Sequence, residues 1–192
     1  MKTCAKIISA ICVTAFLASC QTFSLVSNDK PVEIAGTYTV SPQISWSKAE
    51  SDNTETWTQD GPLLQSLTFY KGVGDGEHVH PVGDNDSQKG PIFRKNMTLI
   101  EIKDLFLNLL KVRGGQNATV TKFSPSKFGT TDGFRMEFEW ATENGVNMRG
   151  FLVGAVIKGE LHAIRYAGTS IHYFEKYQRD AESVIGSIQL KT

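Results

Sequence analysis

The chain has 192 residues, of which 40% are hydrophobic, and it carries 20 basic and 20 acidic side chains. A chain of this length buries roughly 70% of its unfolded surface as one domain, so one hydrophobic core suffices without disulfides. The balanced charge argues against a nucleic-acid partner, and the lack of cysteine after Cys20 excludes thiol chemistry in the folded part.

The first 20 residues are typical of a secretion signal. A short basic start precedes an apolar run over residues 7–17 that is too short to span a bilayer. The following Leu-Ala-Ser-Cys, ending at Cys20, resembles the lipobox of bacterial lipoproteins, whose cysteine receives diacylglycerol and, after cleavage before it, an acyl chain on its new amine. The alternative is an ordinary signal peptide, cleaved near Ala18, with an incidental cysteine.

Lipidation of Cys20 would tether the mature protein to a membrane. Each buried methylene contributes roughly 0.8 kcal/mol, so two or three acyl chains hold a protein permanently whereas one does not. Gln21 stands where the inner-membrane retention signal of such lipoproteins has Asp, so the resemblance implies the outer membrane, facing the periplasm. We therefore expect a signal peptide over residues 1–19, a lipidated cysteine and tether over 20–31, and one α+β domain over 32–192.

The first part of the predicted domain consists of strands. Residues 36–41 alternate apolar side chains with threonines and end before Pro42. Residues 55–59 and 63–70 predict a hairpin across an Asp-Gly-Pro turn, and its inward-facing side chains are Leu63, Leu67 and Phe69. We expect these strands to join one sheet.

Residues 71–96 are rich in glycine and aspartate and lack apolar periodicity, which is typical of a functional or solvated loop. His78 and His80 are two residues apart, so an extended backbone would direct both imidazoles to one side. Nearby carboxylates could complete a zinc or copper site, and these are Asp75, Asp84 and Asp86. A solvated loop is the alternative, because the histidine pair has no fixed third ligand.

A helix is predicted from Thr98, where Thr-Leu-Ile-Glu forms a capping box with Glu101. The apolar pattern ends at Gly114, and its core-facing stripe consists of Leu99, Ile102, Leu105, Phe106, Leu109 and Leu110. Residues 118–123 then read as a strand.

Residues 133–167 predict three consecutive antiparallel strands. In the first, residues 134–140, apolar side chains alternate with charged ones, which is the pattern of a strand with one buried face. Turn signals at Asn144-Gly145 and Lys158-Gly159 would join it to strands over residues 146–157 and 160–167.

Two-residue turns would fix the register of these strands. Phe138 would lie opposite Phe151, and Phe151 opposite Tyr166, on one core face. The other face would hold charged side chains beside two glycines that admit another backbone; these residues are Arg135, Glu137, Glu139, Gly150, Gly154 and Arg165. One interpretation is a helix packed there with an ion-pair ladder at its rim, and the alternative is a binding surface.

A final amphipathic helix is predicted after Ser170, whose hydroxyl could cap it. Its apolar stripe consists of Ile171, Phe174, Tyr177, Ala181, Val184, Ile185 and Ile188. His162 would lie opposite Ala155 on the core face, and His172 in the first helical turn. We interpret both histidines as structural.

The order of these elements resembles the Mog1/PsbP-like superfamily over residues 32–192. The resemblance rests on that order and on residues 133–140, 159–166 and the helix end 181–188. It implies an α+β fold, an antiparallel sheet of six to seven strands flanked by two main helices in an α/β/α sandwich. Members of the superfamily are chiefly accessory or binding proteins, so the resemblance also implies that the chain is not an enzyme.

Three functions are compatible with the sequence. The first is a lipid-anchored accessory or binding module that contacts an envelope partner, because the sequence has no Gly-x-Ser-x-Gly elbow, His-Glu-x-x-His motif or phosphate-binding glycine loop. The second is a zinc or copper binder that uses His78 and His80. The third is a hydrolase with Glu137 or Glu139 as general base and Arg165 as an electrostatic aid. The first function requires no cofactor besides the lipid on Cys20.

Overall fold

The computed structural model describes residues 23–51, 53–80 and 90–191. Its strands and helices, in chain order, are β1 (Ser24–Val26), β2 (Val32–Ile34), β3 (Tyr38–Val40), β4 (Trp46–Glu50), β5 (Thr54–Thr58), β6 (Gln65–Val73), α2 (Leu99–Val112), β7 (Gln116–Phe128), β8 (Thr131–Ala141), β9 (Asn147–Ile157), β10 (Glu160–Thr169), α3 (Tyr173–Gly186) and β11 (Gln189–Leu190). Cys20, and with it the predicted lipid attachment, lies outside the described residues. Within the described ranges, no helix combines the length and the apolar composition needed to cross a bilayer.

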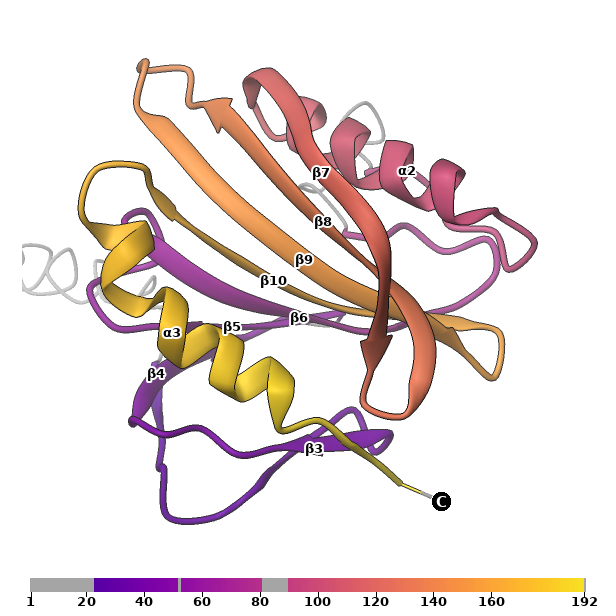
Figure 1. Ribbon diagram of the computed structural model, residues 1–192, viewed down its shortest axis with the longest axis horizontal. Coiled ribbons are helices and arrows are strands. Elements are labelled where there is room, and N and C mark those ends of the chain that lie inside the picture. The colour runs from indigo at the N-terminus through magenta and orange to yellow at the C-terminus, as the bar shows by residue number, and fades with distance from the viewer. Residues whose placement is uncertain (1–22, 52, 81–89, 192) are drawn as a thin grey trace, which may run out of the picture.

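An eight-stranded antiparallel sheet forms the middle of the molecule, in the order β1-β4-β5-β6-β10-β9-β8-β7. One face, here called the α3 face, is covered by α3 and by a small sheet of order β11-β3-β2 (Figure 1). The other, the α2 face, is covered in part by α2. Each face has its own apolar core. The predicted antiparallel sheet with two main helices is confirmed.

The sheet is larger than the predicted six to seven strands, because two short strands extend its β1 edge. β1 comes from the segment assigned to the tether, where Val26 is buried and pairs with Trp46 of β4. A strand of three residues is too short to show an alternating pattern. The strand at Tyr38 also differs from expectation, since it belongs to the small sheet.

The predicted capping box of α2 is present. The Thr98 amide donates to Glu101 Oε2 at 2.7 Å, and the Glu101 amide donates to Thr98 Oγ1 at 3.3 Å. Five members of the predicted stripe are buried against the sheet, whereas Leu99 at the helix start is exposed. The helix therefore begins where local side-chain chemistry satisfies its first amides.

The register of the first hairpin differs by one residue from the prediction. Phe138 pairs with Gly150 and not with Phe151, so the two phenylalanines lie on opposite faces of the sheet. The connection is longer than expected: the Gly145 amide donates to the Thr142 carbonyl at 2.9 Å, and only Gly145 in this turn has a positive φ, 78°. This is a three-residue turn, and the added residue reverses which side chains share a face.

The second hairpin has the predicted two-residue turn. Lys158 and Gly159 both have positive φ, at 52° and 89°, as a turn of type I′ requires. Tyr166 consequently pairs with Phe151, and His162 with Ala155, as predicted. His162 is buried at this position and only 1% exposed, as its structural interpretation expected.

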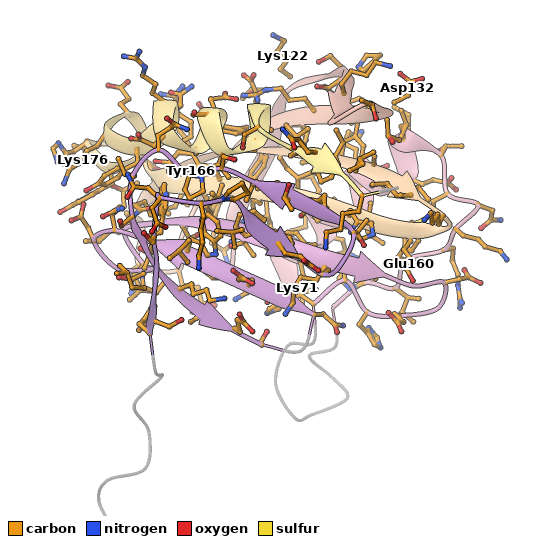
Figure 2. The ribbon with its side chains drawn as sticks, turned by 90° about the horizontal axis from the view of Figure 1, so that it is seen from below. Lys71, Lys122, Asp132, Glu160, Tyr166 and Lys176 are labelled. Carbon is orange, nitrogen blue, oxygen red and sulfur yellow. The ribbon has the colours of Figure 1, made fainter. Side chains whose placement is uncertain are left out.

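The last helix begins later than predicted. His172 precedes α3 with a φ of 75° and makes no side-chain cap, so Ser170 does not cap the helix and His172 is not in its first turn. Ile171, assigned to the stripe, is 85% exposed. The start of α3 is instead held to the sheet by Tyr166, which is labelled in Figure 2. Its hydroxyl donates to the carbonyls of Tyr173 and Phe174, at 3.0 and 2.9 Å.

Candidate functional site

The apolar core of the α2 face lies under α2 and under buried side chains of the β6–α2 segment, such as Val79 and Phe93. In Figure 1, α2 lies toward the β7 side of the sheet, away from β4 and β5. Threonines alternate with other residues along β5, so Thr54 and Thr56 point to the α2 face while Trp57 points into the core under α3. In β6 the same alternation directs Ser66 and Thr68 to the α2 face. These strands therefore present a floor of small hydroxyl side chains.

A cavity of about 370 Å³ opens over this floor, and we call it the arginine pocket. Its volume lies within the range of about 300–1,000 Å³ typical of small-molecule sites. Besides the hydroxyl side chains, the pocket is lined by three basic residues that come from separate elements: His80, Arg113 and Arg165. Arg165 projects from the middle of β10, and Arg113 follows the last turn of α2. His80 lies in the segment between β6 and α2.

The two arginines of the pocket have few partners. Arg165 Nη2 lies 3.5 Å from Thr68 Oγ1, and its Nε is buried with no hydrogen-bond partner among the described residues. Neither Arg113 nor Arg165 has a carboxylate oxygen within 4.0 Å in the described ranges. Two guanidinium groups thus share one cavity without a described counter-ion.

The electrostatics of the pocket agree with an excess of positive charge. Burial, and then the two arginines, lower the pKa of His80 to about 4, so its imidazole is neutral at physiological pH. Burial and the neighbouring Arg165 also lower the pKa of the Arg113 guanidinium. Glu50 lines the pocket, but its carboxylate is bound by Lys48 Nζ at 2.5 Å, which lowers the pKa of Glu50.

This arrangement is suited to binding an anion. Guanidinium groups donate several hydrogen bonds in a planar fork that matches carboxylate and phosphate oxygens. The hydroxyl groups of Thr54, Thr56 and Thr68 supply further donors, and Thr56 Oγ1 lies 3.5 Å from Thr68 Oγ1. His80 adds a ring nitrogen, with Nδ1 3.5 Å from Thr54 Oγ1.

The predicted binding face is split between the two sides of the sheet. The shifted register leaves Arg135, Glu137 and Glu139 on the α3 face. There Arg135 makes a bidentate ion pair with Glu182 of α3, at 3.0 and 2.7 Å. Its guanidinium also stacks on Phe151, 4.2 Å from the ring centroid. This half of the predicted face is therefore the ion-paired rim of a packed helix.

Gly150, Gly154 and Arg165 lie on the α2 face. A Cβ at Gly150 would be 2.8 Å from the ring of Phe138, and one at Gly154 would be 3.1 Å from the ring of Phe134. The two glycines accommodate aromatic rings of β8 and are covered by them. Of this half of the predicted face, only Arg165 lines the arginine pocket.

The hydrolase hypothesis depended on the wrong register. Glu137 and Glu139 are on the α3 face, whereas Arg165 points to the α2 face. The sheet itself separates the two groups, so Arg165 cannot assist a base at either glutamate.

The metal hypothesis stays a prediction, because Asp84 and Asp86 lie outside the described residues. His78 Nδ1 contacts the carbonyl of Gly90, and Asp75 accepts a hydrogen bond from the Lys95 amide at 3.1 Å. Within the described ranges, no group of three metal-binding side chains comes together. His80 also lines the arginine pocket.

Arg113 is the pocket residue that sequence analysis missed. It follows Leu109 by four residues and Leu110 by three, so it lies on the helix face of the buried stripe, but its charged side chain is exposed. A cation at the end of an apolar stripe was the available signal. The partner of Arg113 in space, Arg165, is more than 50 residues away in sequence, and nothing local indicates that they meet.

Comparison with solved structures supports the fold. The chain resembles the solution structure of cyanobacterial PsbP (CyanoP) from Synechocystis sp. PCC 6803, with a TM-score of 0.54, 10% identity, and coverage of 91% of this chain and 95% of CyanoP. A Bacteroides thetaiotaomicron protein gives 0.48, 12% identity, and coverage of 86% and 49%. The Saccharomyces cerevisiae Ran-binding protein Mog1p gives 0.43, 8% identity, and coverage of 89% and 96%. No protein-family model and no curated protein sequence matches the chain. The likeness to CyanoP supports the predicted PsbP-like architecture of the body.

Proposed function

We propose that this protein is a lipid-anchored binding module on the periplasmic face of the bacterial outer membrane, and that it holds a small anionic ligand in the arginine pocket. The observation that carries the proposal is the pair Arg113 and Arg165, which share one cavity without an ion pair to any described carboxylate. The anchor is the lipid on Cys20, as the lipobox indicates.

An anion should bind in the arginine pocket because the unpaired charges of Arg113 and Arg165 are unfavourable when no anion is bound. Two guanidinium groups in one cavity repel each other, and Arg165, which is partly buried, also loses hydration. An anion that accepts hydrogen bonds from both would offset these costs, and hydrogen bonds to charged groups contribute about 1.5–3 kcal/mol each. The neutral hydroxyl floor adds donors without adding a competing negative charge.

Calorimetric titration with inorganic phosphate and with citrate tests the binding site. We expect saturable binding to the wild-type protein, weakened about tenfold or more by Arg113→Gln or by Arg165→Gln. Lys122→Gln is the matched control, because it removes the same charge from an exposed position on β7, at the opposite edge of the sheet from β1. Equal affinity in all four proteins, or no binding to the wild type, would reject the proposed site.

The anchor is tested separately in cells. Labelled palmitate should be incorporated into the wild-type protein and not into Cys20→Ala, and the wild type should fractionate with the outer membrane. Gln21→Asp should redirect the lipidated protein to the inner membrane. An unlabelled wild-type protein would show that Cys20 is not modified and that the N-terminus is an ordinary signal peptide.

A further inference from the structure

Exposed apolar side chains gather at the mouth of the arginine pocket. Phe23 and Leu63 both line the pocket and are 41% and 88% exposed. Leu63 was predicted to face inward with Leu67, but it lies in the β5–β6 connection, outside the strand. Pro62 lines the pocket beside it.

A third exposed apolar side chain belongs to the same surface. Leu25 lies two residues after Phe23, on the same side of the edge strand β1, and is 75% exposed. Its neighbour Val26 points the other way, into the core under α3. We call Phe23, Leu25, Pro62 and Leu63 the apolar rim.

The apolar rim lies next to the predicted lipid attachment. Phe23 is three positions after Cys20, and an extended chain spans at most about 3.6 Å per residue. The acylated cysteine is therefore within roughly 11 Å of Phe23. An anchor this short holds the rim at the membrane surface, where exposed Phe and Leu side chains can insert between headgroups.

We infer that the arginine pocket opens onto the membrane that carries the anchor, and that its ligand is the phosphate of an anionic phospholipid headgroup. This inference rests on the proposed function and deepens it by naming the ligand class. A headgroup phosphate lies just outside the acyl region of the membrane. The apolar rim would therefore contact the lipid while the arginine pocket binds the charged phosphate. Arg113 and Arg165 would bind the phosphate oxygens, and the hydroxyl floor would face the rest of the headgroup.

Photo-crosslinking in vesicles tests this inference with the full-length lipidated protein. The vesicles consist of phosphatidylcholine with a minor fraction of phosphatidylglycerol that bears a photoactivatable group on its headgroup. We expect crosslinks to peptides that line the pocket, reduced about tenfold in the double variant Arg113→Gln, Arg165→Gln and unchanged in Lys122→Gln. Equal crosslinking in the double variant would overturn the inference.

Two further arms separate lipid from free phosphate. Inorganic phosphate should compete with the headgroup crosslink on the wild-type protein, a measurement that holds even if the double variant fails to fold. The exposed rim variant Leu25→Ser, at a position that does not line the pocket, should keep its calorimetric affinity for inorganic phosphate but lose headgroup crosslinks severalfold. Phosphate binding without pocket crosslinks would overturn the inference and leave the proposed function standing, whereas absence of phosphate binding would remove both.

Discussion

Lowering the pH should destabilise the protein through His80. Its pKa is about 4 in the folded protein, because burial and the two arginines disfavour the imidazolium, whereas an unfolded chain has a histidine pKa of about 6.5. A histidine whose pKa is lowered by folding binds its proton more weakly in the native state. Stability is therefore unaffected above about pH 7 and falls as the pH decreases from about 6.5 towards 4.

The size of this effect follows from the two pKa values. A gap between about 6.5 and about 4 corresponds to at most about 3.4 kcal/mol. The imidazole of His80 is only partly buried, so solvent screening reduces this limit, and we expect a loss of about 1–2 kcal/mol. Inorganic phosphate should shrink the loss, since an anion in the pocket favours the imidazolium.

The assay is urea denaturation of the wild type and of His80→Gln across this pH range. Both proteins contain the same titrating carboxylates, so the difference between their free energies of unfolding isolates His80. The wild type should lose more stability than the variant as the pH falls. Parallel curves for the two proteins would show that His80 does not sit beside Arg113 and Arg165 as described.

Three further predictions concern the fold and are measured by urea denaturation. Gly150→Ala should lower the free energy of unfolding by about 1–3 kcal/mol, because a Cβ there would lie 2.8 Å from an aromatic ring carbon. The control Gly186→Ala should not lower it, because a Cβ there would have no atom within 4 Å. Equal stability of the two variants would contradict the register. Arg135→Gln should lower the free energy of unfolding by about 0.5–1 kcal/mol, because it breaks the partly exposed ion pair with Glu182. If the same loss occurs in a protein that already lacks the Glu182 carboxylate, the ion pair is not its cause. Thr98→Ala should cost about 1 kcal/mol through loss of the capping box, and no loss would show that the box does not hold the helix start.

Features encoded by adjacent residues were predictable. The box that starts α2 is formed by side chains three residues apart, and the Lys158-Gly159 turn by two consecutive residues. In both cases the favourable conformation depends on local backbone and side-chain chemistry. The observed capping box and turn therefore match those predicted from the sequence.

The first hairpin shows where local signals become insufficient. Asn144-Gly145 correctly marks a turn, but the same residues fit turns of two or three residues. The Thr142 hydroxyl accepts a hydrogen bond from the Val146 amide at 3.1 Å, which favours the longer form. Because strand side chains alternate, one added residue exchanged the faces of an entire strand and divided the predicted binding surface.

Only individual residues of the arginine pocket, and not the pocket itself, could be predicted from the sequence. Arg165 and His80 were candidates, but each was assigned to a different site. Their approach to Arg113 depends on how α2 packs and on which strands it leaves uncovered, and both are properties of the tertiary fold. The sequence analysis did not use the alternating threonines of β5, and the face that they occupy follows only from the sheet order.

The most direct test of the central claim is a crystal structure of the protein soaked in selenate, whose anomalous scattering locates a tetrahedral anion. The account predicts an anomalous peak in the arginine pocket, with oxygens within hydrogen-bond distance of the guanidinium groups of both Arg113 and Arg165. A pocket without such a peak, or arginines paired with carboxylates of this chain, would contradict it.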